Sequence, residues 1–487
     1  MAESQSMSQM SMSSVAAPNS VNYANQLPLG IESKSQRKLF FPTTGGEYSG
    51  DGTNICRIDL SYDGLIDTSQ SYLMFDVKNN TDEGYQLDLG QPLINRLRVE
   101  CGGVVLEDIQ NYNTLLAGIL VPCQNGIGNS HMDSFNRTRP SQAVFGGVAT
   151  NSFTGASATA LMPVASCAAQ GVGRVATDDT NADTSGTDIK AGNAIIKKGD
   201  KINQCYKLVS GLLDNDKYLP LMLLNAPITI ELTFETKDRA GTGKKSTDLG
   251  AGNLDISALR YVAHTIDLER SFYDRLRGMQ QSSGGVIQIS GTSFRNYSTN
   301  LLDTNTQSLA IPARLRSIKS IFWKCVGSNG KDVYGLSAGG HANLKSYQVK
   351  IGGNMYPPTP INVGVKFNKI EPYLELQKAF GKLGSTVHSD LLSQSSYLVD
   401  ATGVSAYSQN TAAAGKTEHL TAFAPYGIDL ESFRHEIENG VDTSSKALPM
   451  TLEFEQTLKA GAISCQVFIM YDSLFYINMD GTISVSN

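Results

Sequence analysis

The chain has 487 residues, of which 40% are hydrophobic and only 18% charged, and this balance excludes an intrinsically disordered protein. A chain of this length usually divides its core, so we expect two domains of about 200 residues each. The formal net charge of −6 argues against a dedicated nucleic-acid binder, because neutralising phosphates requires clustered Lys and Arg. We therefore expect no tight nucleic-acid binding.

Residues 1–36 are rich in Ser, Gln and Met and show no periodicity, which predicts a flexible N-terminal arm. The arm is either a frayed terminus or a segment that contacts a neighbouring molecule through its adaptable Met side chains. It lacks the basic and apolar regions of a signal peptide, and no apolar stretch of the chain is long enough to span a bilayer. We expect a protein that is made inside the cell, is not secreted and has no transmembrane segment.

The first β unit is expected over residues 37–270, where apolar and polar residues alternate with the period of two that is typical of strands. Gly102 and Gly103 separate two of these runs and predict a two-residue hairpin turn, which needs positive φ. The expected strands cover residues 55–62, 72–78, 94–101, 104–107, 219–224, 228–235 and 259–269.

Two connecting segments of this unit have a different pattern. Residues 108–121 place apolar groups at helical spacing, with Asp108 near the start where a carboxylate is favourable, and they predict a helix that caps one end of the sandwich. Residues 125–200 are dominated by small and polar residues, which predicts a long surface loop. Such a loop is either functional or a tolerated insertion.

A linker with a short helical pattern is expected over residues 271–284, followed by the second β unit over residues 285–487. A helix is expected at 371–381, and Trp323 is expected either in buried packing or in a subunit contact. The expected strands of this unit cover residues 286–297, 315–326, 346–351, 420–424, 450–455 and 464–477.

The second unit repeats the pattern of the first. The run at 93–108, which contains Gly102 and Gly103, is echoed at 344–358 around Gly352 and Gly353. Downstream, the Leu-Pro strand pattern at 218–235 is echoed at 447–455. A chain that duplicates an antiparallel β unit end to end is usually building a structure from copies.

Several separated motifs occur in the order found in one family of proteins. They are Asn95-Arg-Leu-Arg-Val-Glu-Cys-Gly-Gly and its continuation to Asn113, Tyr-Leu-Pro-Leu-Met-Leu-Leu at 218–224, Tyr347-Gln-Val-Lys-Ile-Gly-Gly with Pro357 and Pro358, and Tyr426-Gly-Ile-Asp-Leu-Glu at 426–431. Over roughly residues 38–478 the chain resembles double jelly-roll major capsid proteins, and is most similar to those of polinton-like viruses and virophages.

This resemblance implies an all-β fold of two tandem eight-stranded antiparallel jelly rolls, with short helices in the connecting loops. It also implies a pseudo-hexameric homotrimer, or capsomer, that tiles into the icosahedral shell of a double-stranded DNA virus. The implied partners are the chain itself, neighbouring capsomers, and the penton or minor capsid proteins needed at the vertices. The implied location is the virion capsid.

Signals of catalysis are absent from the sequence. Residues 240–247 only partly match a phosphate-binding loop, and residues 171–176 match a dinucleotide fingerprint without its strand and helix context. The six His residues are scattered, without the spacing of a zinc site. We therefore expect a protein that is not an enzyme, with no catalytic, cofactor-binding or metal-binding residues and no cofactor.

Two other classes of function stay open at this point. One is a β-sandwich glycan-binding or viral attachment protein, which would need an exposed pocket of aromatic and polar side chains. The other is an enzyme on a β scaffold, which would need two converging carboxylates in a cleft. The seven Cys residues show no Cys-x-x-Cys pair, and we expect reduced and mostly buried thiols.

Overall fold

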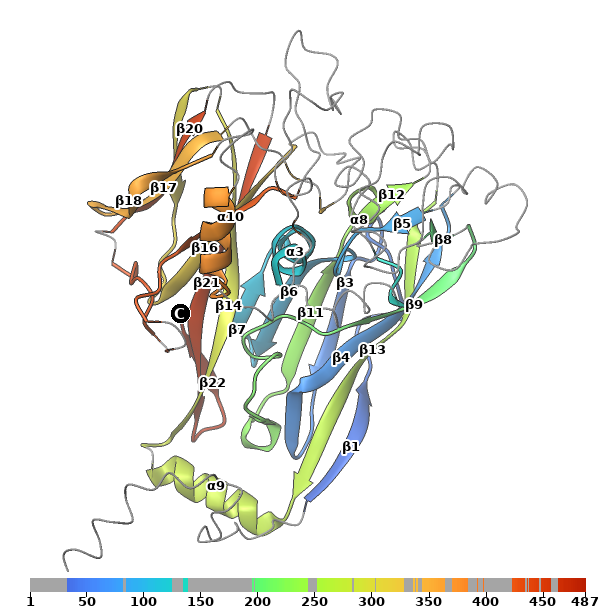
Figure 1. The fold of residues 1–487 in the computed structure, drawn as a ribbon. Helices are drawn as coiled ribbons and strands as arrows, with labels where there is room; N and C mark the ends of the chain where they lie inside the picture. The colour runs from blue at the N-terminus through green and yellow to red at the C-terminus, as the bar shows by residue number, and fades with distance from the viewer. Residues whose placement is uncertain are drawn as a thin grey trace, which may run out of the picture.

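The computed structural model shows two β units side by side, with α9 lying across their lower ends (Figure 1). We refer to the strands between residues 33 and 268 as the first unit and to those between residues 286 and 486 as the second unit. The described residues are 33–81, 85–124, 135–138, 195–196, 198–243, 252–282, 284–302, 304–327, 336–337, 339, 344–363, 370–383, 392, 397, 423–433, 436, 438–445, 448–456 and 463–487.

The first unit contains a six-stranded, a four-stranded and a small three-stranded sheet. Its strands are β1 (Ser33–Phe40), β2 (Glu47–Tyr48), β3 (Ile55–Leu60), β4 (Leu65–Asn79), β5 (Tyr85–Leu87), β6 (Ile94–Cys101), β7 (Val104–Ile109), β8 (Ile195–Ile196), β9 (Lys201–Tyr206), β10 (Leu219–Pro220), β11 (Ile228–Phe234), β12 (Gly241–Gly243) and β13 (Leu254–Leu268). The main sheets have the orders β1-β13-β4-β10 and β3-β11-β6-β7, while β9 also pairs with β4.

The second unit contains a five-stranded and a four-stranded sheet. Its strands are β14 (Val286–Asn300), β15 (Thr306–Ile311), β16 (Ile318–Gly327), β17 (Leu344–Ile351), β18 (Asn354–Asn362), β19 (Pro425–Asp429), β20 (Met450–Gln456), β21 (Ile463–Asn478) and β22 (Ile483–Ser486). Their orders are β14-β21-β16-β19 and β15-β20-β17-β18, with β22 added beside β21.

The two units have the same topology. Each unit has eight main strands, which we number 1 to 8 along the chain, leaving out the small strands β2, β5, β8, β12 and β22. In the first unit β9 and β10 together count as strand 6. With this numbering, both units have one sheet in the order 1-8-3-6 and one in the order 2-7-4-5. All of these pairings are antiparallel. Two facing antiparallel sheets with this crossed order form a jelly roll. The predicted fold class, two tandem eight-stranded jelly rolls, is confirmed.

The predicted hairpin turns are confirmed with one difference between the copies. Gly102 and Gly103 both have positive φ and join β6 to β7, whereas only Gly352 has positive φ in the turn that joins β17 to β18. Positive φ at both central residues is the pattern of a type I′ turn, and positive φ at the first alone is that of type II′. Both types follow the twist of the flanking strands.

Short helices occupy connections between the strands. They are α2 (Tyr112–Leu115), the π-helix η2 (Leu116–Leu120), α3 (Val121–Gln124), the 3₁₀ helix η4 (Leu221–Leu223), α8 (Lys237–Ala240), α9 (Arg270–Ser282) and α10 (Ile370–Ala379). The helix predicted at 371–381 corresponds to α10, and the one predicted at 108–121 corresponds to α2, η2 and α3.

Three local predictions were wrong. Asp108 belongs to β7, where Arg96 binds its carboxylate, so it does not start a helix. The strand predicted at 219–224 ends at Pro220, which has no N–H for the sheet, and continues as η4. The strand predicted at 420–424 is absent at the described residues 423–424; β19 begins at Pro425, where Gly427 lets α10 pack closely.

The ends of the predicted segments also shift. Ser33–Phe40 is a strand, so residues 33–36 of the predicted arm pair with β13, and residues 1–32 lie outside the described residues. Most of the predicted loop at 125–200 also lies outside them, although residues 195–196 form β8. Within the predicted linker, the structure shows the 13-residue helix α9.

Trp323 lies in the core of the second unit, with no exposed surface, so the prediction of buried packing is confirmed. Its ring stacks on Tyr426 and meets Tyr347 edge-on, with centroid distances of 5.5 and 4.6 Å. Among the six Cys residues that the structure describes, all have free thiols and five are buried, as predicted. Cys205 is half-buried, and Cys167 lies outside the described residues.

Candidate functional site: the junction between the two units

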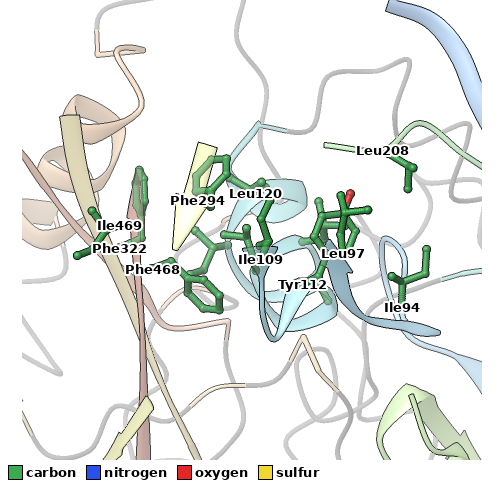
Figure 2. Packing of buried hydrophobic residues seen from close by; sticks show 14 of the residues in the cluster. Ile94, Leu97, Ile109, Tyr112, Leu120, Leu208, Phe294, Phe322, Phe468 and Ile469 are labelled. Carbon is green, nitrogen blue, oxygen red and sulfur yellow. The ribbon is translucent and has the colours of Figure 1, made fainter. Parts of the chain in front are cut away.

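The surface that sets the geometry of this molecule is the junction between its two units. Ile109 at the end of β7 and Leu120 at the end of η2 point toward Phe294 and Phe468 on the outer face of the second unit's larger sheet (Figure 2). All four side chains are at most 5% exposed. The apolar cores of the two units are therefore continuous, and separating the units would expose this surface to water.

A buried lysine crosses this junction. Lys324 on β16 has no exposed surface, and its Nζ donates to the backbone carbonyls of Leu336 and Ser337 at 2.9 and 2.7 Å. Its stem runs along η2 so closely that a Cβ at Gly118 would lie 2.6 Å from Nζ. A methyl group at residue 118 would require the Lys324 side chain to move, so the glycine favours this buried position of the lysine.

Asp88 of the first unit faces the same segment. The backbone N–H of Ser337 donates to Asp88 Oδ2 at 3.0 Å, and the N–H of Leu89 donates to Oδ1 at 2.7 Å. Burial raises the pKa of the Asp88 carboxyl, while these hydrogen bonds and the charge of Lys324 act in the opposite direction. The carboxylate thus ties the first unit to the backbone of the second.

Glu107 holds a loop against the second unit. Its buried carboxylate accepts hydrogen bonds from the backbone N–H of Gly211 at 2.8 Å and of Leu212 at 3.2 Å, and from the hydroxyl of Ser210. A Cβ built at Gly291 on β14 would lie 2.1 Å from the carbonyl oxygen of Gly211. The loop and β14 therefore meet backbone to backbone, and a side chain at residue 291 would push them apart.

Three asparagines of the first unit complete the polar contacts. Asn215 Nδ2 donates to the Ser290 carbonyl at 2.7 Å, and Asn225 Nδ2 donates to the Asp480 carbonyl at 2.9 Å. Asn111 Nδ2 donates to Asn296 Oδ1 at 2.9 Å. Directional bonds spread around an apolar centre fix the rotation of one unit against the other. The junction is built as a rigid joint between the two jelly rolls.

None of these junction residues was predicted as functional, because no local sequence pattern marks them as a site. Only two glycines could have indicated the junction from the sequence. Gly118 interrupts a helical run, and Gly291 interrupts a strand, where a glycine often marks a close approach of another backbone. The hydrogen bonds that Asp88 and Asn215 make to the second unit join residues 249 and 75 positions apart, so no local pattern reveals them.

The described part of the chain offers few groups for metal binding or catalysis. It contains no group of three or more His, Cys, Asp or Glu side chains that could hold a metal ion. Of the six histidines it includes only His264, and of the partial phosphate-loop motif it includes only residues 240–243, which end α8 and form β12. The motif at 171–176 lies outside it. No helix among these residues is long and apolar enough to cross a membrane.

Comparison with known proteins identifies the fold. No family model matches the chain, and no curated protein matches it in sequence. Solved structures do match: the Faustovirus major capsid protein has a TM-score of 0.54 at 9% identity, over 96% of this chain and 94% of that chain. The crystal structure of PBCV-1 VP54, fitted into a reconstruction of the virophage Sputnik, has a TM-score of 0.52 at 11% identity, over 96% and 99%.

The Sputnik virophage structure itself has a TM-score of 0.52 at 10% identity, over 97% of this chain and 92% of that chain. These matches extend over both units of the chain. The chain therefore has the double jelly-roll fold of viral major capsid proteins, as its sequence motifs predicted.

Proposed function

We propose that this chain is the major capsid protein of a double-stranded DNA virus and that it assembles as pseudo-hexameric homotrimers into an icosahedral shell. The single observation that supports this most is the duplication: two jelly rolls with the same strand order are locked side by side in one chain. Three such chains around a threefold axis would present six similar lobes, which suits a nearly sixfold position in a shell.

The proposed mechanism is geometric. A rigid joint between the units is needed because the angle between the two lobes decides whether three chains close into a ring or continue as an open filament. The continuous core and the buried bonds of Asp88, Glu107 and Asn215 support such rigidity. No catalytic step is part of this function, and we propose that the chain is not an enzyme.

Residues 37–270 and 285–487 would then be the two jelly-roll domains, joined by the segment at 271–284. The partners in this proposal are other copies of the chain, neighbouring capsomers, and separate penton or minor capsid proteins at the vertices. The location is the virion capsid, after synthesis inside the host cell. Nucleic acid is not gripped tightly by this acidic chain, whose formal net charge is −6.

Electron microscopy of the purified recombinant chain tests this proposal. Particles with threefold symmetry and six lobes are expected, and concentrating them should give flat arrays or closed shells. Single two-lobed particles at every concentration would contradict the proposal. If those particles also bound an immobilised glycan, the chain would be an attachment or glycan-binding protein instead.

A further inference from the structure

The helix α10 has apolar residues on two faces. Its inner face packs on β16 and β19: Leu376 is fully buried, and the Phe380 ring beyond its end stacks on Phe322 with centroids 4.4 Å apart. Its outer face carries Ile370 and Leu374, which are 65% and 40% exposed. Residues four apart lie on one side of a helix, so these two form an apolar stripe directed away from the protein's own core.

The equivalent helical segment of the first unit has no such exposed stripe. It follows the fifth strand of its jelly roll, as α10 does, and every residue from Tyr112 to Leu120 is buried. The outer side of this segment is covered by the second unit, where Lys324 lies against Gly118 and Phe294 and Phe468 lie beside Leu120 (Figure 2). The helical segment after the fifth strand is therefore covered in the first unit and partly exposed in the second unit.

The surface that covers the first helical segment also has a counterpart in the first unit, which is only partly buried. In the second unit this surface is the outer face of β14, β21 and β16, where Asn296, Phe468 and Phe322 lie in one row across the strands. The equivalent strands of the first unit are β1, β13 and β4, and one of their rows consists of Leu39, Val262 and Tyr72.

On this outer face of the first unit, Leu39 is 38% exposed, Tyr72 and the nearby Met74 are half-buried, and Val262 between the two edges of the row is 2% exposed. The exposed helix stripe and the partly open sheet face are on different units of the same chain. A chain cannot join them to each other while its two units are fixed by the junction. A second copy can, and repeating that contact makes a head-to-tail interface, which closes into a ring when the rotation allows it.

We propose that the stripe formed by Ile370 and Leu374 on α10 binds the outer face of β1, β13 and β4 in a second copy of this chain, and that this contact repeats between chains the junction seen within the chain. The proposal rests on the assembly put forward above and names its interface.

The charges beside the two surfaces support a second copy of this chain as the binding partner. Glu371 and Glu375 lie beside the stripe on α10, with Lys378 Nζ 3.6 Å from Glu375. On the sheet face, Arg37 and Arg260 outnumber Asp76, which Lys201 already pairs at 2.8 Å, and Arg260 Nη2 lies 3.2 Å from the Met74 sulfur. An acidic rim on one surface and a basic rim on the other favour their association and set its orientation.

The test is the mass of the variant Ile370→Asp/Leu374→Asp, measured by size exclusion with light scattering beside the wild-type chain. A charge at an apolar contact must be desolvated to associate, so the variant should elute as single chains of 52.4 kDa. Both positions face solvent within one chain, so its thermal unfolding should match that of the wild type after both are diluted to single chains.

Met279→Asp is the matched control. Met279 is 62% exposed on α9, which lies at the opposite end of the molecule in Figure 1, so this variant should keep the wild-type mass. If the α10 variant keeps the mass of the assembled wild type, the proposed interface is wrong. If the wild-type chain itself is monomeric, the proposed function fails instead, so the two failures are distinguishable.

Cross-linking tests the other side of the contact. The double variant Leu39→Cys/Leu374→Cys, treated with a short bismaleimide, should give covalent products of two and three chains. Each single variant and the wild type, whose native thiols are mostly buried, should give only single chains. Absence of covalent products from an assembled double variant would overturn the assignment of β1, β13 and β4 as the receiving surface.

Discussion

The outer faces of the two four-stranded sheets have the same register but different chemistry. In the first unit Glu231 on β11 lies opposite Arg98 on β6 and Arg57 on β3. In the second unit Glu453 on β20 lies opposite Gln348 on β17 and Ser308 on β15. The glutamate occupies the same place in both copies, and both arginines are replaced by neutral residues.

The interactions of the two glutamates differ accordingly. Arg57 Nε donates to Glu231 Oε2 at 2.8 Å, Arg98 Nη1 lies 3.7 Å from Oε1, and the Glu231 side chain is 7% exposed. Glu453 accepts only hydroxyl groups among the described residues, from Ser308 at 2.7 Å and Thr451 at 2.8 Å. Glu231 therefore belongs to an ion-pair network in the first sheet, whereas Glu453 accepts isolated hydrogen bonds; the second sheet keeps one ion pair elsewhere, between Lys345 and Glu455 at 2.6 Å.

This difference shows that the inward side chains specify the fold, whereas the outward side chains specify the chemistry of the surface. Inward side chains fix strand register, because a shift by one residue would turn every apolar group toward water. Outward side chains can change without altering that register. Retention of register with replacement of the arginines is therefore the expected result of duplicating a jelly roll and then using its two outer faces differently.

We expect the largest loss of stability from a substitution in the core, and this substitution also tests whether the two units unfold together. Trp323→Ala removes the largest fully buried side chain, and should cost about 4 kcal/mol of unfolding free energy. Because the apolar cluster runs through both units, unfolding monitored by circular dichroism should remain a single transition at a lower temperature. Two separate transitions, with the first unit unaffected, would show that the units are independent.

The next effect concerns the joint between the units. Gly291→Ala places a methyl group against the backbone of Gly211 and should cost about 3 kcal/mol, measured by urea unfolding. Gly353→Ala is the control in the same unit, because a Cβ there meets no atom within 4 Å and its φ is not positive. Equal stability of the two variants would contradict the close approach at the joint.

The two glutamates provide a direct comparison of the sheets. Glu231→Gln removes the buried carboxylate that accepts from Arg57 Nε at 2.8 Å and lies 3.7 Å from Arg98, which keeps Glu100 at 3.2 Å, and it should cost about 1 kcal/mol. Glu453→Gln should cost less than about 0.5 kcal/mol, because Glu453 is partly exposed and a glutamine oxygen can still accept from the Ser308 and Thr451 hydroxyls. Equal losses in urea unfolding would mean that the charged network of the first sheet adds nothing to stability.

The smallest expected effect is a change in pH dependence at Asp88. A carboxyl whose pKa is higher in the folded chain binds its proton more tightly there, so it favours folding below its unfolded pKa of about 3.9. That contribution is lost as the pH rises through the folded pKa. Asn does not titrate, so the stability of Asp88→Asn relative to the wild type should rise as the pH increases from 4.

Unfolding in urea at a series of pH values measures this difference. The Asp429→Asn variant, outside the junction, gives the baseline for losing one carboxyl group. A relative stability of Asp88→Asn that stays flat or falls with pH would show that hydrogen bonds from Ser337 and Leu89 outweigh burial at this carboxyl.

Much of the fold could be predicted from local pattern. The strand Ile94–Cys101 was predicted with its correct ends because strict alternation leads into a Gly-Gly turn. The short strand Thr306–Ile311 was not predicted. Of Asn354–Asn362, only the part up to Pro358 was anticipated, as the run after the Gly-Gly turn; its three prolines are tolerated because β18 is an edge strand.

The junction could not be predicted, because its contacts join residues that are distant in sequence. Asp88 meets Ser337, and Asn111 meets Gln466, 249 and 355 residues further along the chain. No periodicity records such pairs, since each side chain is read locally as an ordinary polar residue. The duplication was the sequence feature that contributed most to the proposed function, because it indicated that the chain contains two similar β units.

The central claim is that the duplicated chain completes a ring with copies of itself, and the solution mass tests it most directly. Size exclusion with light scattering of the purified wild-type chain should give three times the 52.4 kDa of one chain. That result would place six jelly rolls in one particle. A well-folded species with the mass of a single chain at all concentrations would contradict the account.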